Sequence, residues 1–488
     1  MSTSSEIKIT PARMLLYSMS GFGIGCADFI VAVYLLKYYT DHVALSASLA
    51  GIALMVGKLL DGVSDPIMGF ISDRTRTRWG RRRPWFLVGA APLALSFIAM
   101  FSAEEGWSQL QLFLWLLSWN VLFWSAQTVI NVPHAALAGE MVEQHDERNA
   151  IMGWREAMQQ LGLLVGASAP LLVLGSMQDA AVDAALASGL SEQAARAVGF
   201  AARGEAHGVM AWQFASLIFV GVLLAFLGTR EPSRPRTPPR ESIFGNFADT
   251  FKSPPFRLFI VVFLFEQIAS GLTATLVLYT IQDWWQFGGR HEIFLIMAYL
   301  LSAVVSIPLW VRAGRRIEKA RIFAIGSFIS AATLLGATLV PLYGLGLAYA
   351  GLIGSGFGVG ARAVMAMSVM PDIIDDDELR THTRKDGAYF GMWSLTRKLA
   401  RALSIGGAGL GLGLWGYQEG ALEQPESAIR GIMWMFSIIP AIAATICGFL
   451  FLRFPITRAI HESTLEELDR RRASEPGTGG SRRRPSEE

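Results

Sequence analysis

Long apolar stretches recur along this chain, and each is long enough to cross a lipid bilayer as a helix. A spanning helix needs about 20 mostly apolar residues, and continuous apolar runs exclude the alternating pattern of a membrane β-barrel. Only 17% of the residues are charged, below the roughly one quarter that is usual for soluble proteins. We therefore predict an all-α membrane protein with twelve transmembrane helices, at residues 14–39, 46–72, 84–102, 109–138, 150–175, 209–229, 256–285, 292–312, 321–341, 345–370, 388–415 and 428–454.

A Pro- and Arg-rich segment, Glu231–Arg240, divides these stretches into two groups of six. Its composition is typical of a linker and excludes a membrane helix. Two parallel repeats of six helices, with a substrate site between them, form the major facilitator fold. We expect an N-terminal six-helix bundle, a cytoplasmic linker, a C-terminal six-helix bundle and a cytoplasmic tail, at residues 1–229, 230–255, 256–454 and 455–488.

Basic residues gather in loops on one side of the predicted membrane. They crowd the segments 72–84, 230–257 and 312–321, whereas the loops on the other side hold acids and few bases. By the positive-inside rule the basic loops and both termini face the cytoplasm. We expect an integral protein of the plasma (inner) membrane. The Ala-rich external segment 178–208 is expected to form one or two short surface helices.

Two carboxylates, Asp61 and Asp65, lie inside the second apolar stretch. Their spacing places both on one face of a helix, one turn apart. Two acids in a low-dielectric site repel each other and are costly to desolvate unless protons, a cation or a basic partner neutralises them. Because ionisable residues inside a membrane mark ion or proton pathways, we expect this pair to bind a cation. The alternative is a position at the cytoplasmic rim, with salt bridges to Lys58 or Arg74.

Several blocks of sequence resemble one family of secondary transporters. The run Gly57–Trp85, which includes the acid pair, resembles the signature of the glycoside–pentoside–hexuronide:cation symporters. The resemblance extends over about residues 10 to 470, and the further blocks that agree are Tyr38–Asp41, Thr128–Pro133, Met370–Leu379 and Gly387–Trp393. It implies alternating access driven by a coupling cation. A non-transporting membrane receptor or scaffold with the same fold is the alternative from another class.

The resemblance assigns a cation site. It implies that Asp61 and Asp65 coordinate the cation and that the Thr128 hydroxyl lies beside it. Hard oxygen ligands suit Na⁺, with H⁺ as the other candidate. Lys398 matches a lysine that can pair with the acids when no cation is bound. The structural alternative for Lys398 is that it snorkels to the cytoplasmic face.

The substrate pocket departs from the sugar carriers of this family. Gly25 stands where they have a sugar-binding acid, Asp28 is displaced from that place by three residues, and Asn131 replaces a second acid. Sugar recognition needs oriented hydrogen bonds and usually a stacking face, and Ala135 replaces the stacking aromatic residue.

The other residues expected at the substrate pocket are basic or apolar. The resemblance places Arg155 and Lys398 at the cavity, near Phe390 and Trp393. Cations beside an apolar wall suit a phosphate head group with one acyl chain, so we expect a lysophospholipid, with a glycoside or hexuronide as the alternative. Arg155 could instead form a structural ion pair with Glu156 or Glu140.

Gating residues are expected at the cytoplasmic side. Asp73 would pair with nearby arginines such as Arg74, and the acidic run that begins at Asp372 would lie opposite them; its alternative is a solvated helix start. The sequence has no Walker motif. We expect no enzymatic activity, no cofactor beyond the coupling ion, no nucleic-acid partner and a monomer among membrane lipids.

Overall fold

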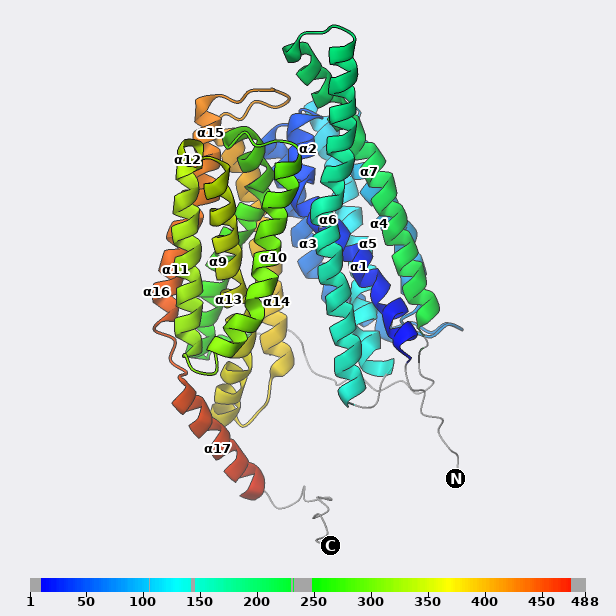
Figure 1. The fold of residues 1–488 in the computed structure, drawn as a ribbon. Helices are drawn as coiled ribbons and strands as arrows, with labels where there is room; N and C mark the ends of the chain where they lie inside the picture. Colours follow the sequence, from blue (N-terminus) through cyan, green and yellow to red (C-terminus); the bar gives the residue numbers. More distant parts are fainter. Residues whose placement is uncertain (1–9, 105, 142–144, 230, 232–247, 475–488) are drawn as a thin grey trace.

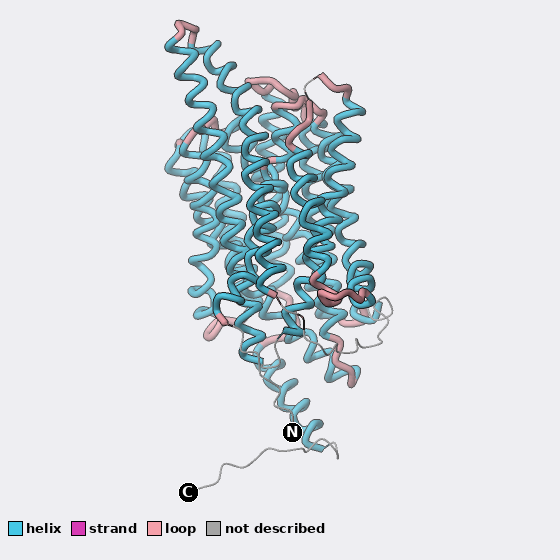
Figure 2. The backbone as a smooth tube through the Cα atoms, turned by 90° about the vertical axis from the view of Figure 1, so that its right-hand side faces the viewer, coloured by secondary structure: helices cyan, strands magenta, loops and turns pink. Residues whose placement is uncertain are grey.

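A computed structural model describes residues 10–104, 106–141, 145–229, 231 and 248–474. Most of the expected linker (230 and 232–247) and the end of the expected tail (475–488) lie outside the described residues. Every regular element within the described residues is a helix, and two groups of long helices stand side by side (Figures 1 and 2). The all-α fold with its membrane-spanning helices is therefore confirmed.

The first group comprises α1 (Pro11–Val33), α2 (Leu35–Asp41), α3 (Ala47–Arg74), α4 (Pro84–Met100), α5 (Gln109–Met141), α6 (His145–Ala187) and α7 (Glu192–Gly228). We call it the N-terminal half. The second group, the C-terminal half, comprises α9 (Pro254–Tyr279), η1 (Thr280–Trp284), α10 (Arg290–Ala313), α11 (Lys319–Gly336), η2 (Ala337–Leu339), α12 (Val340–Tyr343), α13 (Leu345–Thr381), α14 (Asp386–Leu414), α15 (Glu426–Met433), η3 (Trp434–Ile438) and α16 (Ile439–Phe451), followed by α17 (Arg458–Ser474).

Each predicted apolar stretch is occupied by one long helix or by helices that adjoin end to end. Within the described residues, 10 helices are long and apolar enough to cross a membrane. Of the other two predicted spans, α4 has 17 residues, and α14 carries Arg397, Lys398 and Arg401 in its middle. Charged side chains that face lipid are costly. We therefore expect the charged residues of α14 to face the space between the halves.

The external segment 178–208 corrects one expectation. It forms no separate surface helices, because α6 continues to Ala187 and α7 begins at Glu192. The Ser191 side chain caps α7 by accepting a hydrogen bond from the amide of Ala194, and Gly189 supplies a positive φ of 85° in the turn. The Ala-rich sequence favours helix throughout and offers no earlier stop signal. Both membrane helices therefore project beyond their neighbours (Figure 1).

The two halves meet mainly along four pairs of helices: α3 with α14, α6 with α10, α1 with α9, and α2 with α9. Where α3 meets α14, main chain touches main chain: a Cβ on Gly51 would lie 2.8 Å from Cα of Gly409. Farther along α3, a Cβ on Gly62 would lie 3.9 Å from Cβ of Lys398. At Gly69 no described atom of α14 lies within 4 Å. The helices therefore diverge toward the C-terminal end of α3.

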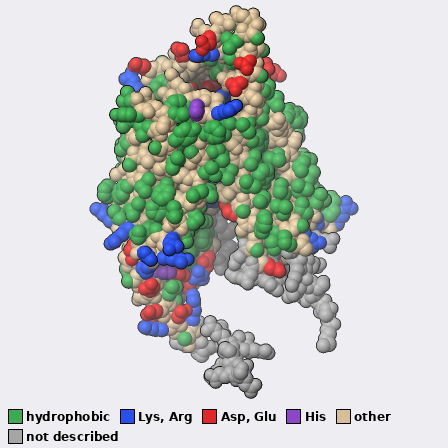
Figure 3. Space-filling view, in the orientation of Figure 1, with side chains coloured by type: hydrophobic (Ala, Val, Ile, Leu, Met, Phe, Trp, Pro, Cys, Tyr) green, Lys and Arg blue, Asp and Glu red, His purple; other side chains and the backbone are tan. Residues whose placement is uncertain are grey.

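This divergence gives the molecule two different ends. The beginning of α1 and the whole of α17 lie at the end where α3 and α14 separate (Figure 1); we call it the terminal end, and the opposite one the far end. Figure 3 shows the surface hollowed between the halves toward the terminal end. The resulting geometry positions the middle of α3, α6 and α14 around a space that opens in one direction.

Candidate functional site

The acid pair, Asp61 and Asp65, lies where α3 and α14 begin to separate. Nζ of Lys398, from the other half, is 2.5 Å from Oδ2 of Asp65 and 3.1 Å from Oδ1 of Asp61. The Thr128 hydroxyl of α5 donates toward Asp61 at 3.1 Å and toward Asp65 at 3.3 Å. The structure thus brings together four residues that the sequence singled out. Five oxygen atoms at most, from two carboxylates and one hydroxyl, converge where a small hard cation could sit.

A second lysine completes the charge balance. Nζ of Lys58 lies 3.0 Å from Oδ2 of Asp61 and 3.1 Å from the centre of the Trp124 ring. The salt bridge with Lys58 that was an alternative reading of the acid pair is therefore present, alongside that with Lys398. The one with Arg74 is absent among the described residues, since its guanidinium stacks 3.3 Å from the centre of the Phe70 ring.

The two lysines are not equivalent. The side chain of Lys58 is 8% exposed and held against Trp124, whereas that of Lys398 is 20% exposed and comes from the opposite half. Two carboxylates and two ammonium groups sum to no net charge, so a cation can enter only when a lysine withdraws. A buried charge without a partner is unfavourable. Of the two lysines, Lys398 is therefore the more accessible, and it is the one that joins the two halves.

Arg155 lies on α6, beside the backbone of Gly21 on α1. It forms no hydrogen bond or ion pair with any other described residue, and its Nε is buried without an acceptor. Neither expected ion-pair alternative is formed: Glu140 instead accepts from Arg81 and Arg82, and Glu156 from Gln160. Arg155 is thus a positive charge left unpaired among the described residues, where α6 lies against α1.

The other expected substrate residues lie on α1, α5 and α14. The Asp28 carboxylate on α1 accepts a hydrogen bond from Nε2 of Gln127 at 2.7 Å, and Asn131 on α5 is half-buried. On α14, Phe390 is exposed and its ring lies 6.0 Å from that of Trp393. Trp393 also packs edge-on against Phe259 and Phe263 of α9. The polar residues of this set thus belong to the N-terminal half and the aromatic residues to the C-terminal half.

The expected gating residues pair within their own halves in this conformation. Asp73 lies 3.0 Å from Arg82. Asp372, in the other half, lies 2.6 Å from Nζ of Lys319 and 3.5 Å from Nε2 of His461 on α17. A gate that joins Asp73 or Arg74 to the acidic run is not formed among the described residues, because the halves are separated at the terminal end.

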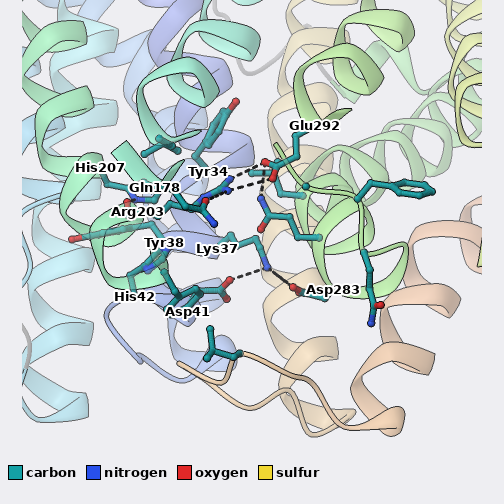
Figure 4. A pocket seen from close by; sticks show the side chains of 18 of the residues that line it. Tyr34, Lys37, Tyr38, Asp41, His42, Gln178, Arg203, His207, Asp283 and Glu292 are labelled. Carbon is teal, nitrogen blue, oxygen red and sulfur yellow. Dashed lines mark hydrogen bonds and ion pairs between the residues drawn. The ribbon is translucent and has the colours of Figure 1, made fainter. Parts of the chain in front are cut away.

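Ion pairs cross between the halves at the far end instead (Figure 4). Lys37 on α2 donates to both carboxylate oxygens of Asp283 on η1, at 2.8 and 3.0 Å, and also pairs with Asp41 at 2.8 Å. The Tyr417 hydroxyl donates to Asp41 at 2.7 Å. Burial and the two nearby carboxylates raise the pKa of Tyr417 well above its usual value of 10, so that it stays a donor.

A second cross-half pair lies beside the first. Arg203 on α7 binds both oxygens of Glu292 on α10, at 2.7 and 3.2 Å, and Gln282 donates to the same carboxylate at 2.9 Å. These residues line a cavity of about 260 Å³ between the halves. The sequence alone did not identify Lys37, Asp283 or Glu292 as residues that link the two halves. The sequence does show single charged residues at the ends of apolar stretches. It does not show which of these residues form ion pairs with one another.

Comparisons with known proteins identify the family and the fold. Residues 16–458 match the family described as MFS/sugar transport protein. The chain is 25% identical to the sodium-dependent lysophosphatidylcholine symporter 1-B of Danio rerio, over 96% of this chain and 92% of the relative. It is 23% identical to the glucuronide carrier protein homolog of Escherichia coli, over 93% and 95%. The crystal structure of a bacterial homolog of the human lysosomal transporter Spinster has the same fold, with a TM-score of 0.67, 13% identity and coverage of 92% of this chain and 99% of that one.

Proposed function

Because the chain belongs to the MFS/sugar transport protein family, and is thus an integral membrane transporter of the symporter type rather than an enzyme, we propose that it couples entry of Na⁺ to transport of a lysophospholipid. The observation that supports this most directly is the bridge from Lys398 to Asp61 and Asp65. It joins the two halves through an acid pair that a cation can also occupy.

The cation step follows from charge balance. Na⁺ between Asp61 and Asp65, with the Thr128 hydroxyl as a further ligand, displaces Lys398. This exchange removes the bridge between α3 and α14 and leaves an ammonium group free beside the central space. Cation and substrate then favour each other's binding if the freed ammonium meets an anionic head group, and by linkage this effect is reciprocal. H⁺ is the other ion that could neutralise the pair.

The charges around the site suggest the substrate and the side of the membrane toward which the protein is open. Arg155 holds the head group, with Asp28 and Asn131 at its side, and Phe390 and Trp393 receive the acyl chain. The lysophosphatidylcholine symporter among the relatives supports this substrate. The alternative is a glycoside or hexuronide, which the glucuronide carrier homolog supports. The excess of basic loop residues favours a cytoplasmic position for the terminal end, in which case the conformation described is closed outward. In this proposal the protein is a monomer in the plasma (inner) membrane.

Transport by purified protein in vesicles tests the coupling. Asp61→Asn and Asp65→Asn remove a charge without leaving a void, and each should abolish Na⁺-stimulated uptake of lysophosphatidylcholine while the protein stays folded. Glu426→Gln, an exposed acid of α15, is the matched control and should transport normally. If both acid-pair variants accumulate substrate and keep their Na⁺ dependence, the cation assignment is wrong.

A further inference from the structure

The ion pairs that close the far end do not balance in charge (Figure 4). Lys37 and Asp41 lie four residues apart on α2, and Nζ of Lys37 is 2.8 Å from Oδ2 of Asp41. This neutral pair belongs to the N-terminal half alone, because residues at this spacing are neighbours on one helix. Asp283, on η1 of the C-terminal half, reaches the same Nζ at 2.8 Å. Closure of the far end therefore brings a second carboxylate to a lysine that already has one.

No other cation among the described residues that line the far-end cavity offsets this carboxylate. The other basic side chain besides the histidines is that of Arg203, and both oxygens of Glu292 bind its guanidinium group. Burial lowers the pKa of His42 to about 4, so that its ring is neutral at pH 7. Nδ1 of His207 lies 2.8 Å from the carbonyl oxygen of Arg203, and its ring centre lies 5.1 Å from that of His42.

The excess negative charge is buried. The side chains of Lys37, Asp41 and Asp283 are 6%, 10% and 15% exposed. The ring of Tyr279 covers Nζ of Lys37 at 4.4 Å from its centre, and the nearby Glu419 accepts a hydrogen bond from the first amide of α3. A buried charge without a counter-charge of its own is costly, and two carboxylates that share one site repel each other. One proton removes both costs.

The hydroxyl group of Tyr417 distinguishes the two carboxylates. Its oxygen lies 2.7 Å from Oδ1 of Asp41 and 3.1 Å from Oδ2 of Asp283. A hydroxyl has one hydrogen to donate, and Asp41 is the nearer acceptor. Asp41 also accepts from Thr40 at 2.9 Å and from Lys37, whereas Asp283 has Lys37 as its other donor. A hydrogen on Asp283 would complete the chain, because the Tyr417 oxygen could accept it.

We propose that the far-end ion pairs form a pH-sensitive switch, in which closure of the far end takes up one proton between Asp283 and Tyr417 and opening releases it. In the open form the two carboxylates are apart, and a carboxyl group that faces water is ionised at neutral pH. Low pH on the far side therefore favours the closed form, and the closed form is lost as the pH rises. This proton is separate from the cation proposed at Asp61 and Asp65.

Distances between the halves, measured as a function of pH, test the switch. The turn between α6 and α7 and helix α12 lie at the far end of opposite halves (Figure 1). They contain the exposed residues Leu190 and Leu342, whereas both native cysteines are buried. Spin labels on Leu190→Cys and Leu342→Cys of the full-length protein report the closed and open populations by pulsed electron paramagnetic resonance.

The measurement is made without Na⁺ or substrate between pH 5.5 and 8.5. The double variant Arg203→Gln/Glu292→Gln removes the second cross-half pair without changing the net charge, and it should populate both forms. In this background the ratio of closed to open protein should fall as the pH rises, by at most about tenfold per pH unit for one proton. A ratio that does not change with pH overturns the switch.

Further variants in the same background identify the group that holds the proton. Asp283→Asn is neutral at every pH, so it should remain closed over the whole range and lose the pH dependence. Tyr417→Phe removes the acceptor of the proton and should move the response to lower pH. Glu423→Gln, an exposed acid of the same loop as Tyr417, is the matched control and should respond as the background does.

Two results would contradict this assignment. A response that persists in Asp283→Asn but disappears in His42→Gln assigns the switch to the histidine and overturns the proposal. A response at the same pH in Tyr417→Phe overturns the position of the proton. Because the measurement uses neither Na⁺ nor substrate, these outcomes are independent of the proposed function, which transport by the acid-pair variants tests separately.

Discussion

Lys398 and Asp65 belong to opposite halves of the molecule, yet Nζ of Lys398 lies 2.5 Å from Oδ2 of Asp65. The lysine therefore occupies the place that a coupling cation would take, and it also fastens α14 to α3. A cation that displaced Lys398 would therefore also remove this link between α3 and α14. Variants of Lys398 can test this relationship without measuring transport.

Replacement of the lysine should increase the response to Na⁺. In Lys398→Met the acid pair keeps only Lys58, so the variant without Na⁺ should be destabilised, by less than the roughly 3–5 kcal/mol of a broken, fully buried ion pair, because the Asp65 side chain is 37% exposed. Na⁺ should restore much of this loss. Thermal unfolding with and without NaCl measures the effect: the Na⁺-induced rise in Tm should be larger than in the unmodified protein. Lys398→Arg, which keeps the charge, should respond as the unmodified protein does. An equal rise in both would contradict the exchange.

The far-end ion pair should hold the outward side closed. Lys37→Met leaves Asp283 and Asp41 buried together without their cation, which is costly and should favour separation of α2 from η1. Cysteines introduced on the walls of the far-end cavity should then be labelled faster by a polar maleimide. The double variant Lys37→Met/Asp283→Asn removes both charges and should label more slowly than the single one. If the single variant labels at the unmodified rate, Lys37 does not control closure.

Asp73 should act only in the other conformation. Here it pairs with Arg82 of its own half, so Asp73→Asn should leave the described state nearly unchanged. We expect it to weaken closure at the terminal end, where Arg82 and its neighbours would meet the acidic run of α13. Labelling of cysteines on the cytoplasmic side of the cavity should increase in the presence of Na⁺ and substrate. Unchanged labelling would limit Asp73 to organising its own loop.

The aromatic residues Phe390 and Trp393 should make binding affinity depend on the length of the acyl chain. Each buried CH₂ contributes roughly 0.8 kcal/mol, so affinity for lysophospholipids should rise with chain length. Trp393→Ala removes a ring that packs on Phe259 and Phe263, and it should weaken binding of long chains more than of short ones. Arg155→Ala should lower affinity by a similar factor at every length. Competition by free sugars, with indifference to chain length, would instead favour the glycoside alternative.

Long apolar runs were sufficient to predict the spanning helices, because length and hydropathy are local properties. The family resemblance, which the match over residues 16–458 confirms, placed Asp61 next to Lys398, a contact that spacing alone could not supply. The far-end pair of Lys37 and Asp283 was missed because the two residues are 246 positions apart. The separate surface helices expected at 178–208 were wrong because an Ala-rich sequence extends an existing helix as readily as it starts a new one.

The approach of Gly51 to Gly409 has a mechanical consequence. Neither residue has a side chain, so the backbones of α3 and α14 touch there, while the side chains of Met55 and Ser48 on α3 fill the adjoining spaces at Gly406 and Gly413 of α14. Sliding one helix along the other would force both side chains out of these spaces, and close packing opposes that. The contact thus holds the two helices at a fixed separation at one point along their length, about which the halves would have to tilt.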